Sequence, residues 1–252
     1  MKNRWSTRAA LLFALTSVSS FANSAKAQNL NDVQSLGFIG PCDNASKKDA
    51  YDFEEVEDLI RGPEKSWYLL NFQCESDSNV DGVRGLWFKG SDEKKFRKIA
   101  EYDRNLFVQA NHRKDWLLFV CGPGSGEANA FLLPVRAFTS TRRIPRPNLN
   151  GSNVAFDGID PAGYIDLLRV CRTFIPKQFN GRTEMEVTWL NDSEIGIYVW
   201  ARNPDENASW TGTAIYSLKT SSIKKSRALP VNGFSWFGEI AVPDKGYMGL
   251  GD

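Results

Sequence analysis

Short apolar and aromatic runs alternate with polar loops along most of this chain. The clearest case is Glu194 to Leu218, EIGIYVWARNPDENASWTGTAIYSL, where two apolar runs flank a loop that contains Pro, Asn and Asp. Ser66 to Lys89, SWYLLNFQCESDSNVDGVRGLWFK, and Asp115 to Val135, DWLLFVCGPGSGEANAFLLPV, have the same layout. Runs of this length, rich in Trp, Tyr, Phe, Ile and Val and bounded by turn residues, predict β-hairpins.

The hairpins recur at a nearly regular spacing. Two further cases are a weaker run from Asn153, NVAFDGIDPAGYIDLLRV, and a shorter one from Phe234, FSWFGEIAVPDKGYMG. The apolar runs then begin near Trp67, Trp116, Val154, Glu194 and Phe234, with spacings of 49, 38, 40 and 40 residues. Periods of about 40–50 residues with several strands per unit are typical of propeller blades. We therefore predict an all-β fold, a small β-propeller of about five blades over residues 66–252, with a β-sandwich as the alternative.

The segments after three of the hairpins predict further strands in each unit. Residues 88–103, 135–147 and 218–230 each place a polar, basic turn after a strand and then a short apolar stretch. The run from Trp116 to Val120 is apolar throughout, as expected of an inner strand that is covered on both faces. Lys94 to Ile99 alternates more, as expected of an outer strand.

The order of features in Ile195 to Pro230, IGIYVWARNPDENASWTGTAIYSLKTSSIKKSRALP, resembles WD-type β-propeller repeats, in particular those of the periplasmic Tol-system propeller proteins. The resemblance extends over residues 66–249 and implies architecture alone. The S-P-D-G turn of that family is replaced by His112-Arg113-Lys114-Asp115 and by Leu190-Asn191-Asp192-Ser193. The terminal W-D of the family is also missing from every unit.

The N-terminus has the layout of a secretory signal peptide over residues 1–27. Lys2, Arg4 and Arg8 precede a run of apolar and small residues from Ala9 to Phe21, and Ala25-Lys26-Ala27 is an A-x-A cleavage pattern. The run is shorter than the roughly 20 apolar residues of a membrane-spanning helix. We expect cleavage after Ala27 and a periplasmic or secreted location in a bacterial envelope.

Cleavage would leave residues 28–65 as an N-terminal extension before the repeated units. Within it, Phe53 to Ile60 places apolar residues at i, i+3, i+6 and i+7. This spacing is compatible with a short helix or with an outer strand that closes the ring.

Charge and cysteine content limit the classes of partner. The mature chain would keep 27 basic and 30 acidic residues, a net charge of −3, so we expect neither nucleic-acid binding nor membrane insertion. Its even number of cysteines predicts two disulfides, and of three possible pairings we expect Cys42–Cys74 and Cys121–Cys171. No C-x-x-C occurs, and the single histidine, His112, is near no cysteine pair, so we expect no metal or cofactor.

The catalytic motifs that we considered are not supported. GPGSGEAN is no P-loop because it lacks the G-K-[ST] ending, and no nucleophile elbow because Pro123 and Glu127 flank Ser125 at −2 and +2. We interpret it as a hairpin loop, and His112 as an exposed turn residue. The loop acids occur in no glycosidase motif that we identify; they are Asp81, Glu127, Asp157, Asp160, Asp192 and Asp205.

Aromatic and basic loop residues are the candidate partner contacts. Trp210 and Tyr247 lie in polar stretches, and residues of this type are enriched among interface hot spots. Arg142 and Arg143, with Arg146, occupy a basic turn that corresponds to the turn with Lys224, Lys225 and Arg227. We predict an exported, non-catalytic β-propeller binding protein, such as an inhibitor or immunity protein for an envelope-acting protein. A five-bladed glycosidase that uses loop carboxylates and a lectin-like glycan-binding propeller are the alternatives.

Overall fold

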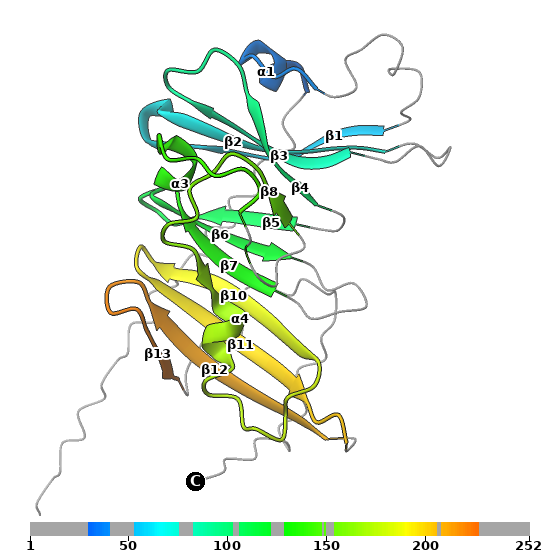
Figure 1. Cartoon of the computed structure of the whole chain (residues 1–252), viewed down its shortest axis with the longest axis vertical. Coiled ribbons are helices and arrows are strands. Elements are labelled where there is room, and N and C mark those ends of the chain that lie inside the picture. Colours follow the sequence, from blue (N-terminus) through cyan, green and yellow to red (C-terminus); the bar gives the residue numbers. More distant parts are fainter. Residues whose placement is uncertain are drawn as a thin grey trace, which may run out of the picture.

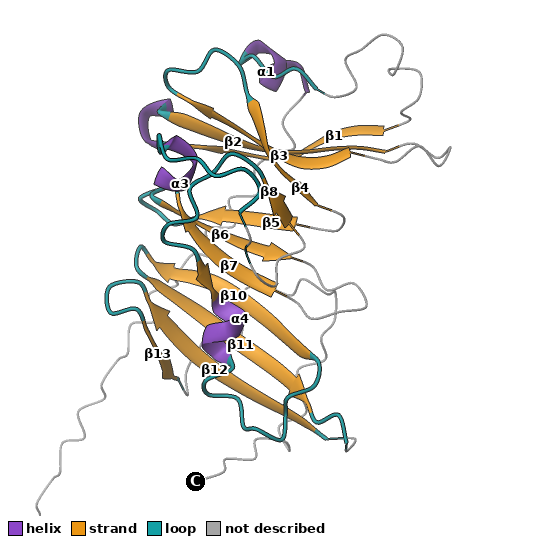
Figure 2. Ribbon diagram, in the orientation of Figure 1, coloured by secondary structure: helices purple, strands orange, loops and turns teal. Residues whose placement is uncertain are grey.

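Three antiparallel β-sheets stack face to face in a column in the described part of the chain (Figure 1). The computed structural model describes residues 30–40, 53–75, 83–102, 106–121, 129–147, 149, 154–205 and 208–226. The all-β class is therefore confirmed, and Figure 2 shows that helices are few and short. None of the three sheets closes on itself.

Each sheet is built mainly from strands that follow one another along the chain. The first sheet has the order β1 (Phe53–Arg61), β2 (Trp67–Glu75), β3 (Val83–Gly90), β4 (Arg97–Tyr102) and β8 (Val154–Phe156). The second sheet has the order β5 (Leu106–Ala110), β6 (Trp116–Cys121), β7 (Asn129–Pro134) and β9 (Ile165–Asp166). The third sheet has the order β10 (Thr183–Asn191), β11 (Glu194–Arg202), β12 (Ser209–Ser217) and β13 (Ser222–Lys225). The helical segments are α1 (Leu30–Ser35), the 3-10 turn η1 (Pro63–Lys65), α3 (Arg136–Thr139) and α4 (Leu167–Cys171).

The three strongest hairpins predicted from the sequence are confirmed. The strand pairs β2–β3, β6–β7 and β11–β12 are all antiparallel. The β6–β7 ladder ends with Cys121 opposite Asn129, so the strands on both sides of the glycine-rich stretch pair as expected of a hairpin. The loop itself, residues 122–128, lies outside the described residues.

The predicted unit near Val154 is wrong. β8 pairs with β4 at the edge of the first sheet, and β9 pairs with β7 at the edge of the second sheet. The predicted basic turn after β7 also begins with the short helix α3 instead of running into a strand. The connection from β7 to β10 thus adds one strand to each of two sheets already begun. The predicted unit near Phe234 lies outside the described residues.

The layer between the first and second sheets is the largest part of the core. Its centre is a group of buried phenylalanines in which the rings of Phe119 and Phe131 stack at 4.9 Å and that of Phe156 meets Phe119 edge-on at 5.7 Å. β7 is buried at every position and β6 at all positions after Trp116. The prediction that this inner run is covered on both faces is therefore confirmed.

The other two layers follow from the alternation of side chains along the strands. Leu118 and Val120 point to the opposite face from Leu117 and Phe119 and pack with the third sheet and α4. The far face of the first sheet is covered by Val33 of α1 and by Phe38, which meets Phe72 and Trp87 edge-on. One end of the column is thus closed by the N-terminal segment.

The segment from Phe53 to Arg61 is a strand at the edge of the first sheet, so the helix interpretation is wrong; the strand closes no ring, because this sheet is open. Its ladder with β2 has a bulge between Val56 and Asp58. Because a bulge adds one residue to the strand, Val56 and Leu59 lie on the same face although they are three residues apart. The bulge explains the helix-like spacing in the sequence.

Candidate functional site

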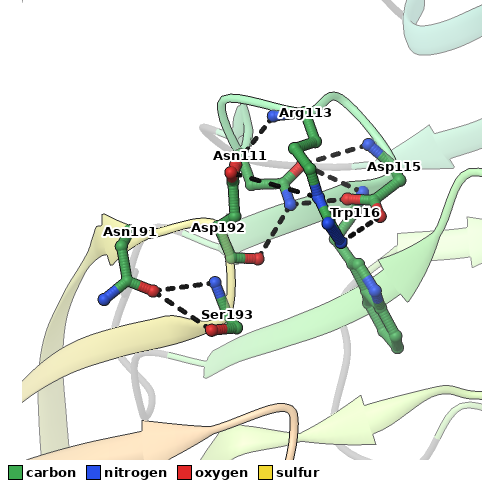
Figure 3. Close-up of polar contacts among 7 residues, drawn as sticks. All are labelled: Asn111, Arg113, Asp115, Trp116, Asn191, Asp192 and Ser193. Carbon is green, nitrogen blue, oxygen red and sulfur yellow. Dashed lines mark hydrogen bonds and ion pairs between the residues drawn. The ribbon is translucent and has the colours of Figure 1, made fainter.

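A buried amide connects the second sheet to the third (Figure 3). The Asn111 side chain is 1% exposed, and its Oδ1 accepts hydrogen bonds from the backbone N–H groups of Asp115 (3.0 Å) and Trp116 (3.1 Å). Its Nδ2 donates to Asp115 Oδ1 at 2.6 Å and to the Asp192 carbonyl oxygen at 3.0 Å. One side chain therefore closes the β5–β6 turn and holds it against the β10–β11 turn.

Charged groups complete this junction. Asp192 Oδ1 accepts a hydrogen bond from the backbone N–H of Arg113 at 2.8 Å, and the Arg113 guanidinium pairs with Asp115 (3.6 Å) and Asp192 (4.0 Å). His112 is exposed in the same turn, as predicted. The two carboxylates share one exposed guanidinium, and exposed ion pairs of this kind add little stability beside the buried hydrogen bonds of Asn111.

A second polar cluster lies at the bulge of β1. Asn71, which is 4% exposed, donates from Nδ2 to Glu57 Oε2 at 2.7 Å and to the Leu106 carbonyl oxygen at 3.0 Å. The Tyr102 hydroxyl donates to Asn71 Oδ1 and lies 3.3 Å from Glu57 Oε2. Asp58, the next residue, is opposite Asn71 in the ladder. The bulge therefore places the Glu57 carboxylate against one buried amide and one phenol, with Asp58 next to it in the strand.

Burial raises the pKa values of two groups at this bulge, the Asp58 carboxyl and the Tyr102 hydroxyl. It raises the pKa of Asp58 to about 6, against a smaller opposing effect of a hydrogen bond with the Leu59 backbone. It also raises the pKa of Tyr102 above its usual range, and the charge of Glu57 adds to this increase. The charge of Glu57 is not among the causes of the Asp58 shift, so the raised pKa of Asp58 follows from its burial. The sequence did not reveal this cluster because the bulge is visible only in the register.

The basic loop, residues 140–147, carries two of the predicted partner contacts. Ser140 Oγ lies 3.2 Å from Asp160 Oδ2 and accepts a hydrogen bond from the Arg142 backbone at 3.0 Å, and the Ile144 N–H donates to Ile159 O at 2.9 Å. Arg143 donates from Nε to the Ser140 carbonyl oxygen at 3.2 Å. The loop is thus fixed at its start and at its middle.

The side chains of the basic loop point outward. Arg142, Arg143 and Arg146 are exposed, and Ile144 is 38% exposed among them. Arg143 lies 3.8 Å from Glu93, in the turn between β3 and β4 of the first sheet, and this partly exposed pair adds little stability. Three guanidinium groups around an exposed aliphatic side chain make a surface suited to an acidic partner with an apolar spot.

The predicted equivalence of the two basic turns is not supported. Lys224 and Lys225 lie on β13 of the third sheet, whereas Arg143 contacts Glu93 in the first sheet. The second sheet separates these two in the column (Figure 1). Arg227 lies outside the described residues.

The predicted exposed aromatics have different outcomes. Trp210 is a half-buried residue of β12 whose ring meets Phe174 at 5.8 Å, so the prediction that it lies in a polar loop is wrong. Its ring also covers Gly212, where an added Cβ would come within 2.3 Å of the indole. Trp210 therefore closes the edge of the core between the second and third sheets. Tyr247 lies outside the described residues.

The predicted disulfide between Cys121 and Cys171 is wrong. Both residues are buried, and they are not joined to each other. Cys121 points into the layer between the first and second sheets, whereas Cys171 of α4 lies on the other face of the second sheet. Burial raises the pKa of the Cys171 thiol to about 12, so this thiol is unreactive near neutral pH. Cys74 is buried at the end of β2, and its predicted partner Cys42 lies outside the described residues.

The predicted loop acids are not brought together. Asp192 belongs to the junction at Asn111, Asp160 accepts a hydrogen bond from the backbone N–H of Ala162, and the backbone of Asp205 is bound to Asn203. Each is thus held by its own turn, and the backbone of Asp157 is bound to Ile99. Asp81 and Glu127 lie outside the described residues.

An open hollow of about 390 Å³ lies beside the start of β10. Arg172, Lys177, Phe179 and Thr183 are among the described residues that line it, and none of the described lining residues is acidic. The part of the chain that the structure describes holds no group of three or more His, Cys, Asp or Glu side chains placed to bind a metal ion. It also contains no helix with the length and apolar character needed to cross a membrane.

Comparison with known proteins gives no relationship for this chain. No family model matches the sequence, and no curated protein is significantly similar to it. The functional argument therefore rests on the chemistry of the basic loop and of the bulge cluster.

Proposed function

We propose that the protein is an exported, non-catalytic binding protein that engages an acidic protein partner through the basic loop. The observation that carries the proposal is the exposure of Arg142, Arg143 and Arg146 around Ile144 on a loop fixed by hydrogen bonds. A fixed loop loses little conformational entropy when it binds, and this favours affinity. An inhibitor or immunity protein for an envelope-acting protein is the form of this function that we favour.

The backbone of the basic loop gives a second reason. Arg146 has a φ of 45°, in the left-handed region that residues other than glycine seldom occupy. This conformation costs on the order of 1 kcal/mol, which the contacts of the loop must offset. A strained, exposed arginine on a rigid support is a feature more often found in binding loops than in simple connections.

The architecture that we propose for this function is propeller-like. The three described sheets have five, four and four strands, and we interpret their face-to-face stacking as that of consecutive blades. In this interpretation the column is part of a ring of about five blades. Loops such as residues 140–147 then present partner contacts on a rigid support.

The bulge cluster supports a second candidate function, a glycosidase. Glu57 and Asp58 offer two carboxylates in different environments, one held by Asn71 and Tyr102 and one with a raised pKa. Hydrolysis of a glycosidic bond requires such a pair. This candidate replaces the predicted loop acids with acids of β1.

Capture from an envelope fraction tests the proposed function. The bait is the mature chain from Gln28, compared with a variant that carries Arg142→Glu and Arg143→Glu. We expect one protein to be retained by the unchanged chain and to be depleted at least about tenfold on the variant, because charge reversal repels an acidic surface. The matched control carries Lys224→Glu and Lys225→Glu on β13 and should retain the partner.

Two results would overturn the proposal. Equal retention by the unchanged chain and the arginine variant would show that the basic loop is not the contact. Turnover of a polysaccharide that disappears in a Glu57→Gln variant would favour the glycosidase.

A further inference from the structure

The outer face of the third sheet carries a row of large side chains. Ile195, Ile197 and Val199 of β11 point into the layer shared with the second sheet. Because side chains alternate along a strand, Tyr198 and Trp200 point to the other face. Both of these residues are half-buried.

The neighbours of these aromatic residues are known from the register. Tyr198 lies opposite Glu186 of β10 and Thr213 of β12, and Trp200 lies opposite Glu184 and Thr211. Ile215 lies on the same face, between Gly196 of β11 and Lys224 of β13. The outer face is therefore a flat, mixed surface with two aromatic rings and one aliphatic side chain near its centre.

This outer face differs from the other sheet faces of the column. The described residues form three hydrophobic clusters, and none of the three includes Tyr198, Trp200 or Ile215. By contrast, the outer face of the first sheet is covered by α1 and Phe38. Stacked sheets of this kind need a cover at each end, since a bare terminal face exposes apolar area to water.

The chain leaves the described structure at the edge of this same sheet. The Ser226 N–H donates to Thr213 O at 2.9 Å, directly after β13. The following 26 residues, 227–252, are rich in large apolar side chains between Phe234 and Val242, FSWFGEIAV. Four strands at a spacing of about 4.8 Å span roughly 15 Å, whereas an extended chain advances about 3.3 Å per residue. The C-terminal segment is therefore long enough to cross the outer face more than once.

We propose that the outer face of the third sheet is the docking site of residues 227–252, with apolar side chains from Phe234 to Val242 placed against Tyr198 and Trp200. The sequence and the sheet complement each other, since the apolar run begins eight residues after Ser226, and Tyr198 and Trp200 belong to none of the hydrophobic clusters of the described residues. Burial raises the pKa of Glu186 and of Tyr198, two residues of this face. Because an ionised carboxylate is costly to bury without a partner, Glu186 must stay near the rim of the docked segment. The proposal does not depend on the binding function of the basic loop.

Photo-crosslinking of the full chain tests this docking directly. A variant with benzoylphenylalanine at Tyr198 should give cross-linked peptides that join the third sheet to residues 227–252 within one chain. Cross-links to a second copy, cross-links to another protein, or cross-links only to neighbouring strands of the same sheet would each overturn the proposal. Mass spectrometry of the digested monomer distinguishes these results.

A double-mutant cycle gives a second measurement. Trp200→Ala and Trp236→Ala, alone and together in the full chain, should show an interaction that changes the unfolding equilibrium constant by at least about threefold. Trp210 provides the matched control because it lies on the opposite face of the same sheet and packs on Phe174. Trp210→Ala and Trp236→Ala should be additive, and additivity of the Trp200 pair would contradict the docking.

Discussion

Replacement of Asn111 by alanine tests the connection between the second and third sheets. The variant removes two acceptor contacts, with the backbones of Asp115 and Trp116, and two donor contacts, with Asp115 and Asp192. The side chain is 1% exposed, so water does not readily replace it. A hydrogen bond contributes about 1 kcal/mol net, and a buried group left without a partner costs about 1–3 kcal/mol. We expect a loss of about 2–4 kcal/mol in the free energy of unfolding.

Urea unfolding followed by tryptophan fluorescence measures this loss. His112→Ala is the matched control, because His112 is the adjacent residue, lies in the same turn and is exposed. We expect the control to change the free energy of unfolding by no more than about 0.5 kcal/mol. Asn111→Asp places a carboxylate oxygen against Asp115 Oδ1 and the Asp192 carbonyl oxygen in a buried site, so its loss should be at least as large as that of the alanine variant. An Asn111→Ala variant as stable as the His112 control would refute the role of this amide.

Three further predictions follow from the core, the bulge cluster and the thiols. Phe119→Ala should lower the free energy of unfolding by about 3–5 kcal/mol, measured in urea, because its ring packs against Phe131 and Phe156; a loss below about 1 kcal/mol would contradict this packing. Asp58 has a raised pKa in the folded state, so it favours folding below its unfolded pKa near 4, and this contribution should be lost as the pH rises through about 6. Asp58→Asn should remove that decline, which is at most about 3 kcal/mol and is reduced by partial exposure; an unchanged pH profile would argue against the shift. Peptide mapping of the denatured, unreduced protein should find no disulfide that joins Cys121 to Cys171, since the structure does not join these two residues; a peptide pair cross-linked through them would contradict this.

The hairpins could be predicted from the sequence because their signal is local. Runs such as Trp116 to Val120 combine strand-forming residues with flanking turn residues, and these two local properties are enough to predict a hairpin. The strand at the edge of a sheet, by contrast, can come from a segment that is distant in the sequence. The stretch from Val154 to Asp166 contributes one short strand to each of two sheets, and the spacing of apolar runs contains no information about this division.

The candidate sites show the same limit. The exposure of Arg142 and Arg143 followed from their charge, whereas the packing of Trp210 on Phe174 depends on a distant segment that covers the strand. The cluster of Glu57, Asn71 and Tyr102 joins three strands through a bulge. A bulge shifts the alternation by one residue, so the apolar spacing at Val56 and Leu59 resembled a helix until the register was known.

The affinity of the captured partner for the purified protein tests the central claim most directly. Isothermal titration calorimetry at one salt concentration should compare the unchanged chain, the variant with Arg142→Glu and Arg143→Glu, and the control with Lys224→Glu and Lys225→Glu. We predict a Kd that rises at least about tenfold for the arginine variant and stays within about twofold for the lysine control. Equal Kd values for all three proteins would contradict the assignment of the basic loop as the binding surface.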